Sequence, residues 1–324
     1  MIARFFAQNR RLVRCLAWLV ATACLGLFLL SFDVGAAWQK LSHAKPGWIV
    51  VAVLANFAAL PLLTAQWSQL LPATRPISWK ILWDCATVSV AAMTVLPFGG
   101  GHAVAVGMIA VRGSAGLPGA LSLMALEQLS DGFVKLALLL TALAVAPLSA
   151  ALQHASWIFA AVMAIATAAA LWIAQHTRAP TKHRWVAKWA HHLDVLKRPG
   201  SFVVAVGLSA AIRVAALVAI YAVQRSLGVD LPVKILPVVL AAVTFATLVT
   251  IAPGNLGVYE AATFAAYRLL GVPAGEAAAL GLLQHACLLV PLVGTGYVRT
   301  VVRAISPSRL TAPTGPTTDQ ANSR

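Results

Sequence analysis

Three charged side chains stand four residues apart inside an otherwise apolar stretch of the chain. Glu127, Asp131 and Lys135 have the spacing of one helix face, and Gln128 lies next to them. A charge within a membrane costs several kcal/mol unless it is paired or hydrated. The group therefore has two interpretations: the polar wall of a substrate cavity, or an Asp131–Lys135 ion pair that neutralises itself and fixes helix packing.

Three arginines adjoin or interrupt apolar runs: Arg112, Arg213 and Arg268. Arg213 stands in the middle of its run, where a buried guanidinium requires an anion. That anion could be a carboxylate, from Glu127, Asp131 or Glu260, or a bound phosphate, which suits the planar fork of arginine. Arg112 and Arg268 could instead extend their side chains to the membrane interface.

Two segments rich in glycine and proline interrupt the apolar runs. The first contains Pro97, Gly99, Gly100 and Gly101, and the second contains Pro253, Gly254 and Gly257. Glycine and proline end a helix by freeing or removing backbone groups, and in lipid such groups persist only inside protein or beside a wet cavity. We therefore expect two broken or re-entrant helices around a cavity.

Other polar side chains gather near these two breaks: His102, Asn255, Tyr259, Glu260, Gln284 and His285. Each could satisfy freed backbone groups, and Glu260 could simply cap the helix that restarts after the second break. Together with helix N-termini they could instead bind an anionic head group. The predicted substrate-binding residues are Arg112, Glu127, Gln128, Asp131, Arg213, Asn255, Tyr259, Glu260, Arg268 and Gln284.

The composition defines the environment in which these residues act. The chain has 324 residues, of which 60% are hydrophobic and only 10% charged, and its mean hydropathy is +0.84. These values exclude a soluble globular protein, a secreted disulfide domain and a disordered chain. The net charge of +15 fits the cationic bias of cytoplasmic membrane loops and does not require a nucleic-acid partner.

The cysteines and histidines offer no convincing metal or redox site. Cys15, Cys24, Cys85 and Cys287 lie in apolar runs without a C-x-x-C pair, so we interpret them as packing residues. The histidine group His183, His191 and His192 lacks a thiol or carboxylate that would complete a zinc site. We expect neither a metal nor a cofactor.

The apolar runs have helix length and lack the alternation of strands. Because a crossing needs about 20 residues, we predict an all-α integral membrane protein, a polytopic helix bundle of about eight full spans plus two broken or re-entrant segments. The expected spans are 15–31, 48–66, 82–96, 118–145, 157–174, 202–223, 235–251 and 276–298.

The two breaks belong to a predicted internal repeat. Pro97 with Pro253, Gly101 with Gly257, Arg112 with Arg268 and Gln128 with Gln284 all align at one offset, 253 − 97 = 156. The alternative is chance similarity between two membrane segments rich in alanine and leucine. We favour duplicated halves at about 48–150 and 202–300.

Basic residues give the expected orientation. Segment 175–200 carries six cations against one acid, which predicts a basic amphipathic linker. This linker and both cationic ends of the chain should be cytoplasmic. Both broken segments must then cross the membrane, and the two halves are inverted, as in transporters that bind substrate at the repeat interface. If both segments re-enter instead, the halves are parallel and the linker lies outside.

The predicted domain boundaries follow from the same features. Residues 1–305 form one polytopic membrane domain, which includes both halves and the linker. Residues 306–324 are rich in Pro, Thr and Ser and have no apolar period, so we expect a disordered tail.

The segment Pro253–Glu260, followed by Leu270-Gly271-Val272, resembles the signature of the lysylphosphatidylglycerol synthase membrane-region family, a flippase-like group. The first half resembles the family at Leu96–Gly100, Arg112-Gly113, Leu126–Gln128 and Asp131-Gly132. The similarity runs from about residue 10 to residue 305. Fused members carry a soluble aminoacyl transferase domain, whereas only a short tail follows Val298 here, so the resemblance implies lipid translocation rather than lysyl transfer.

We therefore predict a flippase or lipid transporter that moves a polar or charged lipid, such as a phospholipid, a hopanoid or a polyprenyl-linked lipid. The chain has no P-loop motif, so transport would be downhill or driven by an ion or proton gradient, with Glu127, Asp131 or Glu260 as proton carriers. One alternative is a lipid-modifying transferase with Glu127 and Asp131 as acid and base, and another is a non-catalytic subunit of a lipid synthase. The expected partners are membrane lipids and such an enzyme, in a bacterial inner membrane with both termini cytoplasmic.

Overall fold

The computed structural model describes residues 32–72, 76–96, 100–145, 150–176, 199–248 and 252–305, together with single positions between 19 and 30. Several predicted features lie outside the described residues: Pro97 and Gly99 of the first break, nearly all of the linker and the tail 306–324. Most of the expected first span, 15–31, also lies outside them.

Within the described part of the chain every regular element is a helix, which confirms the all-α class. The first half contains α4 (Pro46–Leu70), α5 (Trp79–Val95), α6 (Gly100–Arg112) and α7 (Gly116–Val145), preceded by the short α3 (Val34–Ser42). The second half contains α10 (Pro199–Ser226), the 3-10 turn η2 (Val233–Ile235), α11 (Leu236–Ala246), the 3-10 turn η3 (Pro253–Asn255), α12 (Val258–Leu269) and α13 (Ala274–Ile305). Helix α8 (Ala150–His176) stands between these two groups of helices in the sequence.

Four of the described helices, α4, α7, α10 and α13, are long and apolar enough to cross a membrane. The other expected spans are shorter or less completely described. Helix α5 has 17 residues, and the expected span 235–251 is represented by η2 and by α11, which has 11 residues and ends at Ala246. A crossing by helix alone needs about 20 residues, so α11 does not supply one by itself.

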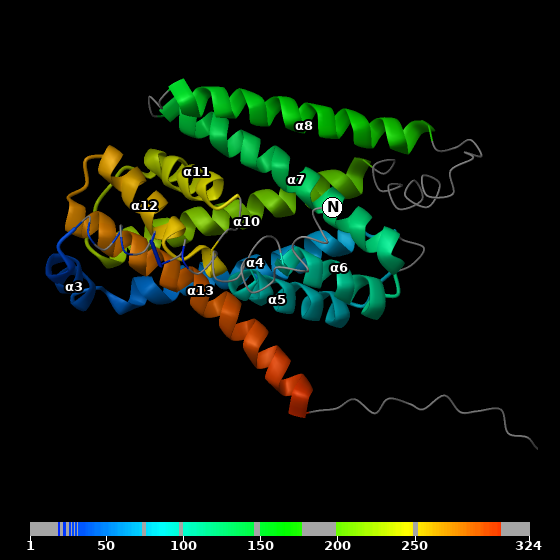
Figure 1. Cartoon of the computed structure of the whole chain (residues 1–324), viewed down its shortest axis with the longest axis horizontal. Coiled ribbons are helices and arrows are strands. Elements are labelled where there is room, and N and C mark those ends of the chain that lie inside the picture. The colour runs from blue at the N-terminus through cyan, green and yellow to red at the C-terminus, as the bar shows by residue number, and fades with distance from the viewer. Residues whose placement is uncertain are drawn as a thin grey trace, which may run out of the picture.

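Helices α4 and α10 pack against each other and form the centre of the bundle (Figure 1). The backbone N–H of Lys45 donates a 2.8 Å hydrogen bond to the carbonyl oxygen of Ser226. Because Lys45 precedes the first residue of α4 and Ser226 is the last residue of α10, the two helices are antiparallel.

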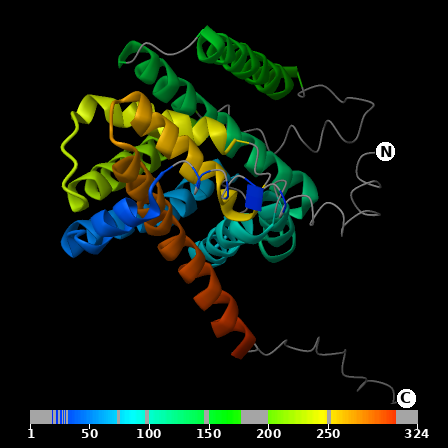
Figure 2. The same cartoon turned by 60° about the vertical axis from the view of Figure 1, so that its left-hand side comes forward.

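Helix α13 passes along one side of this pair, in contact with α4, α5 and α12. Its C-terminal part extends beyond the bundle in both views (Figures 1 and 2). On the opposite side α8 lies along α7, and its Phe159 ring meets Phe245 of α11 edge-on, with the ring centroids 5.4 Å apart. The outward side chains of α8 include Trp157 and Ile165, which are 73% and 69% exposed, as expected for a face that contacts lipid.

A proline in α13 is compensated by an amide on α4. Pro291 has no backbone N–H, so the carbonyl oxygen of Cys287, four residues earlier, loses its helical partner. The side-chain Nδ2 of Asn56 donates to that oxygen at 3.1 Å and also to Ala52 O of its own helix at 3.0 Å. This buried amide therefore joins α4 to the irregular turn of α13.

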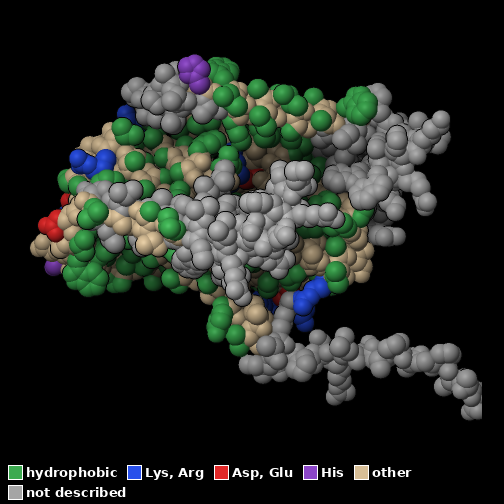
Figure 3. Space-filling view, viewed as in Figure 1, with side chains coloured by type: hydrophobic (Ala, Val, Ile, Leu, Met, Phe, Trp, Pro, Cys, Tyr) green, Lys and Arg blue, Asp and Glu red, His purple; other side chains and the backbone are tan. Residues whose placement is uncertain are grey.

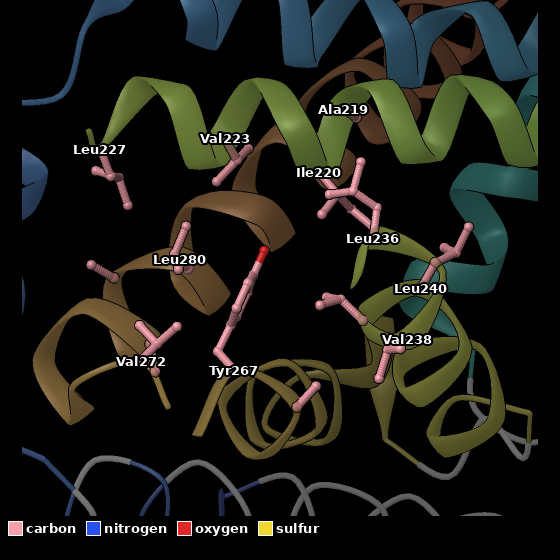
Figure 4. Close-up of a cluster of buried hydrophobic side chains, with 14 of the residues drawn as sticks. Ala219, Ile220, Val223, Leu227, Leu236, Val238, Leu240, Tyr267, Val272 and Leu280 are labelled. Carbon is pink, nitrogen blue, oxygen red and sulfur yellow. The ribbon is translucent and has the colours of Figure 1, made fainter. Parts of the chain in front are cut away.

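The main apolar core lies where α10, α11, α12 and α13 meet (Figure 4). Tyr267 of α12 is fully buried among Val223, Leu280 and their neighbours. Its hydroxyl accepts a 3.0 Å hydrogen bond from Gln224 Nε2 of α10, so the polar end of the ring is satisfied inside the core.

The second break has the backbone that its sequence predicts. Gly254, Asn255 and Gly257 have φ angles of 62°, 55° and 83°, a region that glycine enters without steric cost. A Cβ on Gly254 would lie 3.4 Å from the carbonyl oxygen of Thr94, near the end of α5. The second break therefore packs against the stretch of chain that leads into the first break.

Candidate functional site

The charged residues of α7 meet Arg213 of α10 between the two long helices. Lys135 Nζ lies 2.8 Å from Asp131 Oδ2, which is the ion pair that the spacing of four residues allowed. Arg213 Nη2 also donates to Asp131, with distances of 2.7 Å to Oδ1 and 2.8 Å to Oδ2. One carboxylate thus holds two cations, one from its own helix and one from the other half of the chain.

Glu127 lies one helical turn before Asp131 and completes what we call the charge cluster: Glu127, Asp131, Lys135 and Arg213. Its Oε2 atom is buried and has no hydrogen-bond partner among the described residues. The indole N–H of Trp67, on α4, approaches the Glu127 carboxyl without reaching hydrogen-bond geometry. Arg213 Nε is buried and unpartnered in the same described set.

These two unpaired atoms have complementary chemistry. An arginine Nε donates a hydrogen bond and suits an anionic oxygen. A carboxylate oxygen accepts a hydrogen bond from a hydroxyl or an ammonium group, and after protonation it can donate one. A buried polar atom without a partner costs about 1–3 kcal/mol. Within the described structure, the cluster therefore has one donor and one acceptor that could form hydrogen bonds with a polar ligand.

A second layer of polar side chains supports the cluster. Gln66 Nε2 of α4 donates to Ser130 Oγ of α7 at 2.8 Å and to Ser209 Oγ of α10 at 2.7 Å. Ser130 Oγ in turn donates to the carbonyl oxygen of Glu127 at 2.9 Å. All three polar side chains are buried, so this junction fixes how α4, α7 and α10 sit around the charges.

Gln66, Trp67 and Ser209 were not predicted as site residues. For Gln66 a signal was present, because a glutamine near the end of an apolar span is itself a sign of a buried polar contact. Lys135 was predicted only as a partner of Asp131. Ser209 gives no such signal, because serine is common in membrane helices.

The surface view places charges inside a recess. The face in Figure 3 is mainly hydrophobic over the described elements, with charged side chains at its edges. A recess below α8 also shows small areas of acidic and basic side chains at its base. His102 of α6 is exposed and lies within electrostatic range of Lys135, so the start of α6 lies near the charge cluster.

Glu260 has a different environment, at the start of α12. Its Oε2 accepts a 2.7 Å hydrogen bond from the backbone N–H of Gly257, so it closes the capping box of α12. Its Oε1 lies 2.8 Å from Nδ1 of His285 on α13. The capping role that the sequence allowed for Glu260 is therefore present in its geometry.

The ring of His285 stacks on Tyr259, with centroids 4.3 Å apart and an interplanar angle of 13°. The Tyr259 hydroxyl accepts a 2.9 Å hydrogen bond from Gln284 Nε2. Together with Gly257 and Glu260, these residues form what we call the Glu260 cluster. Two amide oxygens near it, of Gln284 and Asn255, are buried without a partner among the described residues.

Three predicted site residues belong to neither cluster. Gln128, Arg112 and Arg268 are exposed, and Arg268 Nη1 donates to the carbonyl oxygen of Val272 at 2.7 Å, in the turn that follows α12. Gly101 packs α6 against α5, because a Cβ there would lie 2.8 Å from Ser89 O. Gly100 begins α6, and Pro253 is buried in η3.

No group of three or more His, Cys, Asp or Glu side chains that could hold a metal ion occurs in the described part of the chain.

In the comparison with protein families, residues 14–296 match the lysylphosphatidylglycerol synthase TM region. A search of the curated proteins and a search of the solved structures each gave no match.

Proposed function

The chain belongs to the lysylphosphatidylglycerol synthase TM-region family, and from that premise we propose that it moves a lipid with a polar or charged head group across the bilayer. Membership makes it an integral membrane protein linked to lipid synthesis or transport. The proposed cargo is a phospholipid, a hopanoid or a polyprenyl-linked lipid, and membrane lipids are the proposed partners.

The observation that carries this proposal is the charge cluster with its two unpaired atoms. Arg213 Nε and Glu127 Oε2 are desolvated without a protein partner among the described residues, which suits a site that a ligand completes. In this proposal Arg213 binds a lipid phosphate, while the tails remain in the bilayer and only the head group passes the cluster.

We further propose that the chain is an inverted repeat. Four elements of each half correspond in order: α4 with α10, α5 with η2 and α11, α6 with α12, and α7 with α13. Their contacts correspond as well, because α5 packs on α13 as α11 packs on α7, and α4 packs on α13 as α10 packs on α7. The antiparallel packing of α4 and α10 supports inversion, because related helices of a parallel repeat would cross in the same direction.

In this arrangement the charge cluster lies between the halves. Asp131 belongs to the first half and Arg213 to the second, so their ion pair links the two units that would move relative to each other in alternating access. Release of this pair by a competing lipid phosphate would couple cargo binding to that movement.

The proposed topology predicts opposite sides for two equivalent lysines. Lys80 and Lys234 are both exposed, at the starts of α5 and of η2. A cysteine at Lys80 should react with a membrane-impermeant maleimide only from the cytoplasmic side, and a cysteine at Lys234 only from outside. If both cysteines are labelled from the same side, the inverted repeat is contradicted. The proposed cytoplasmic position of both termini in an inner-membrane protein is then contradicted as well.

A lipid-modifying transferase would need Glu127 and Asp131 as an acid and base pair. Both oxygens of Asp131 are already bound by cations, which leaves it poorly placed to take a proton from a substrate. The geometry therefore favours transport over transfer.

The test is a scrambling assay in proteoliposomes with acyl-labelled phosphatidylglycerol as the anionic probe and acyl-labelled phosphatidylcholine as the zwitterionic probe. A membrane-impermeant reductant bleaches outer-leaflet label, so flipping appears as bleaching beyond one half. We expect flipping of at least one probe above protein-free vesicles. Bleaching that stops at one half for both probes contradicts a phospholipid cargo, and bleaching that also stops at one half for a labelled polyprenyl phosphate and a labelled hopanoid contradicts the proposal.

A further inference from the structure

We propose that Glu127 takes up one proton when a lipid phosphate binds at Arg213, so that the anionic head group and a proton occupy the charge cluster together. This inference rests on the proposed function. It specifies in addition that the head group is anionic and that a proton accompanies it.

The argument begins with the charge balance of the cluster. Two cations, Lys135 and Arg213, stand against two carboxylates, Glu127 and Asp131, so the cluster is neutral when all four are ionised. A phosphodiester brings one further negative charge into a buried site. An uncompensated charge there costs several kcal/mol, and a single proton removes it.

Among the four groups, Glu127 is the one whose geometry leaves it able to take the proton. Asp131 is held by both cations, at 2.7–2.8 Å. Glu127 has a buried oxygen with no hydrogen-bond partner in the described structure, so protonation breaks no bond at that atom. The proton turns this oxygen from a group that repels a phosphate into one that can donate to it.

Among the described residues around Glu127, we find no other buried group that could take up the proton without losing a contact. The charged groups that act on it are Asp131 and Lys135 of its own helix and Arg213 of α10, and the Trp67 indole faces it from α4. Helices α4 and α11, which also pack on α7, carry no charged residue. The other described charged or titratable groups on elements packed against α7 are exposed or half-buried: His102 and Arg112 on α6, His154 on α8, Lys234 on η2, and Tyr221 and Arg225 on α10, where Arg225 pairs with Asp230.

A direct coupling follows between the two ligands. By linkage, if phosphate binding favours the protonated carboxyl, then protonation strengthens phosphate binding by the same factor. Transport of the lipid anion with one proton would move no net charge across the membrane, so a pH gradient could drive it and a membrane potential could not.

Proton uptake can be measured by calorimetry of the purified protein in two buffers of different ionisation enthalpy. The probe is dihexanoyl phosphatidylglycerol, whose phosphodiester keeps one negative charge between about pH 6 and pH 9. We expect proton uptake that rises toward one per lipid at the alkaline end, with a Kd that increases up to about tenfold per pH unit there. Binding without proton uptake throughout this range overturns the inference.

The Glu127→Gln variant should bind the lipid with no proton uptake and with a Kd independent of pH. Its matched control is Glu276→Gln, which makes the same change at a carboxylate paired with Lys40, 2.6 Å away and outside the cluster. Glu276→Gln should keep the proton uptake of the unmodified protein. Undiminished uptake by Glu127→Gln would contradict the assignment of the proton to Glu127.

Two further outcomes are separable. If the unmodified protein does not bind the lipid, or if Arg213→Gln binds it equally well, the proposed function fails at its binding step. If dimethyl phosphate binds as tightly as the lipid, the site recognises a soluble phosphodiester as well as a lipid, and the lipid assignment is overturned. The calorimetric measurement on the unmodified protein needs no variant, so poor folding of Glu127→Gln leaves the inference testable.

Discussion

The charge cluster and the Glu260 cluster both bury a carboxylate beside a cationic or protonatable group, but they differ in what remains unpaired. Glu260 has a partner on each oxygen, His285 on one and the Gly257 backbone on the other. Glu127 has a buried oxygen, and Arg213 a buried nitrogen, without a described partner. The Glu260 cluster closes a helix end, whereas the charge cluster keeps a donor and an acceptor that a ligand can use.

This difference separates a structural role from a binding role. A capping carboxylate stabilises the broken helix by satisfying backbone N–H groups that lipid cannot. A cluster shared between the halves of the chain has no such backbone to satisfy, and its charges have to be explained by pairing and by what they bind. Gln284 Oε1 and Asn255 Oδ1, in and beside the Glu260 cluster, also have no hydrogen-bond partner among the described residues.

The largest effect should come from removing Asp131 alone. Asp131→Asn leaves Lys135 and Arg213 without their anion, and an uncompensated buried charge costs about 3–5 kcal/mol, so the yield of folded protein should fall sharply. The double change with Lys135→Gln removes one of the two stranded cations and should recover most of the yield. Size-exclusion yield and thermal melting measure both.

Transport separates the two interpretations of this pair. If the Asp131–Lys135 pair serves packing alone, the double variant recovers flipping together with yield. We expect recovered yield and lost flipping, because Arg213 then lacks the anion that positions it for the lipid.

A smaller effect is expected at the Glu260 cluster. Glu260→Gln replaces the charge but keeps an acceptor for the Gly257 N–H, so we expect a loss of about 1–3 kcal/mol in stability from the weakened His285 contact. Flipping per folded molecule should stay within about twofold of the unmodified protein, a change of about 0.4 kcal/mol in barrier. Abolished flipping at normal stability would place Glu260 in the transport path and remove the contrast between the clusters.

The smallest effect should follow changes at the exposed arginines. Arg112→Gln and Arg268→Gln alter side chains that lie outside both clusters, and exposed substitutions usually change stability by about 0.5 kcal/mol or less. Flipping in the same proteoliposome assay should be unchanged. A large loss in either variant would show that the site extends to the ends of the broken helices.

Much of the fold could be predicted from local sequence. Apolar runs of helix length gave the all-α class, the spacing of four residues gave the Asp131–Lys135 pair, and glycine and proline gave the second break with its positive φ angles. These features depend on residues close together in the chain, so their geometry follows from helix periodicity and backbone sterics.

The contacts between helices could not be predicted in the same way. Arg213 had three candidate carboxylates, and only the packing of α10 on α7 selects Asp131, 82 residues away in the chain. The same holds for Gln66, whose partners Ser130 and Ser209 come from two other helices. Helix rotation and crossing position decide such pairs, and an apolar sequence constrains both weakly.

The central claim is that the charge cluster binds the lipid that crosses, and Arg213 tests it most directly. Arg213→Gln should be compared with Arg225→Gln, which makes the same change on the same helix at an exposed ion pair with Asp230. At equal reconstituted amounts, we expect Arg213→Gln to flip labelled phosphatidylglycerol about 10–100-fold more slowly, as loss of a charged hydrogen bond predicts, and Arg225→Gln to match the unmodified protein. Full flipping by folded Arg213→Gln would contradict the account.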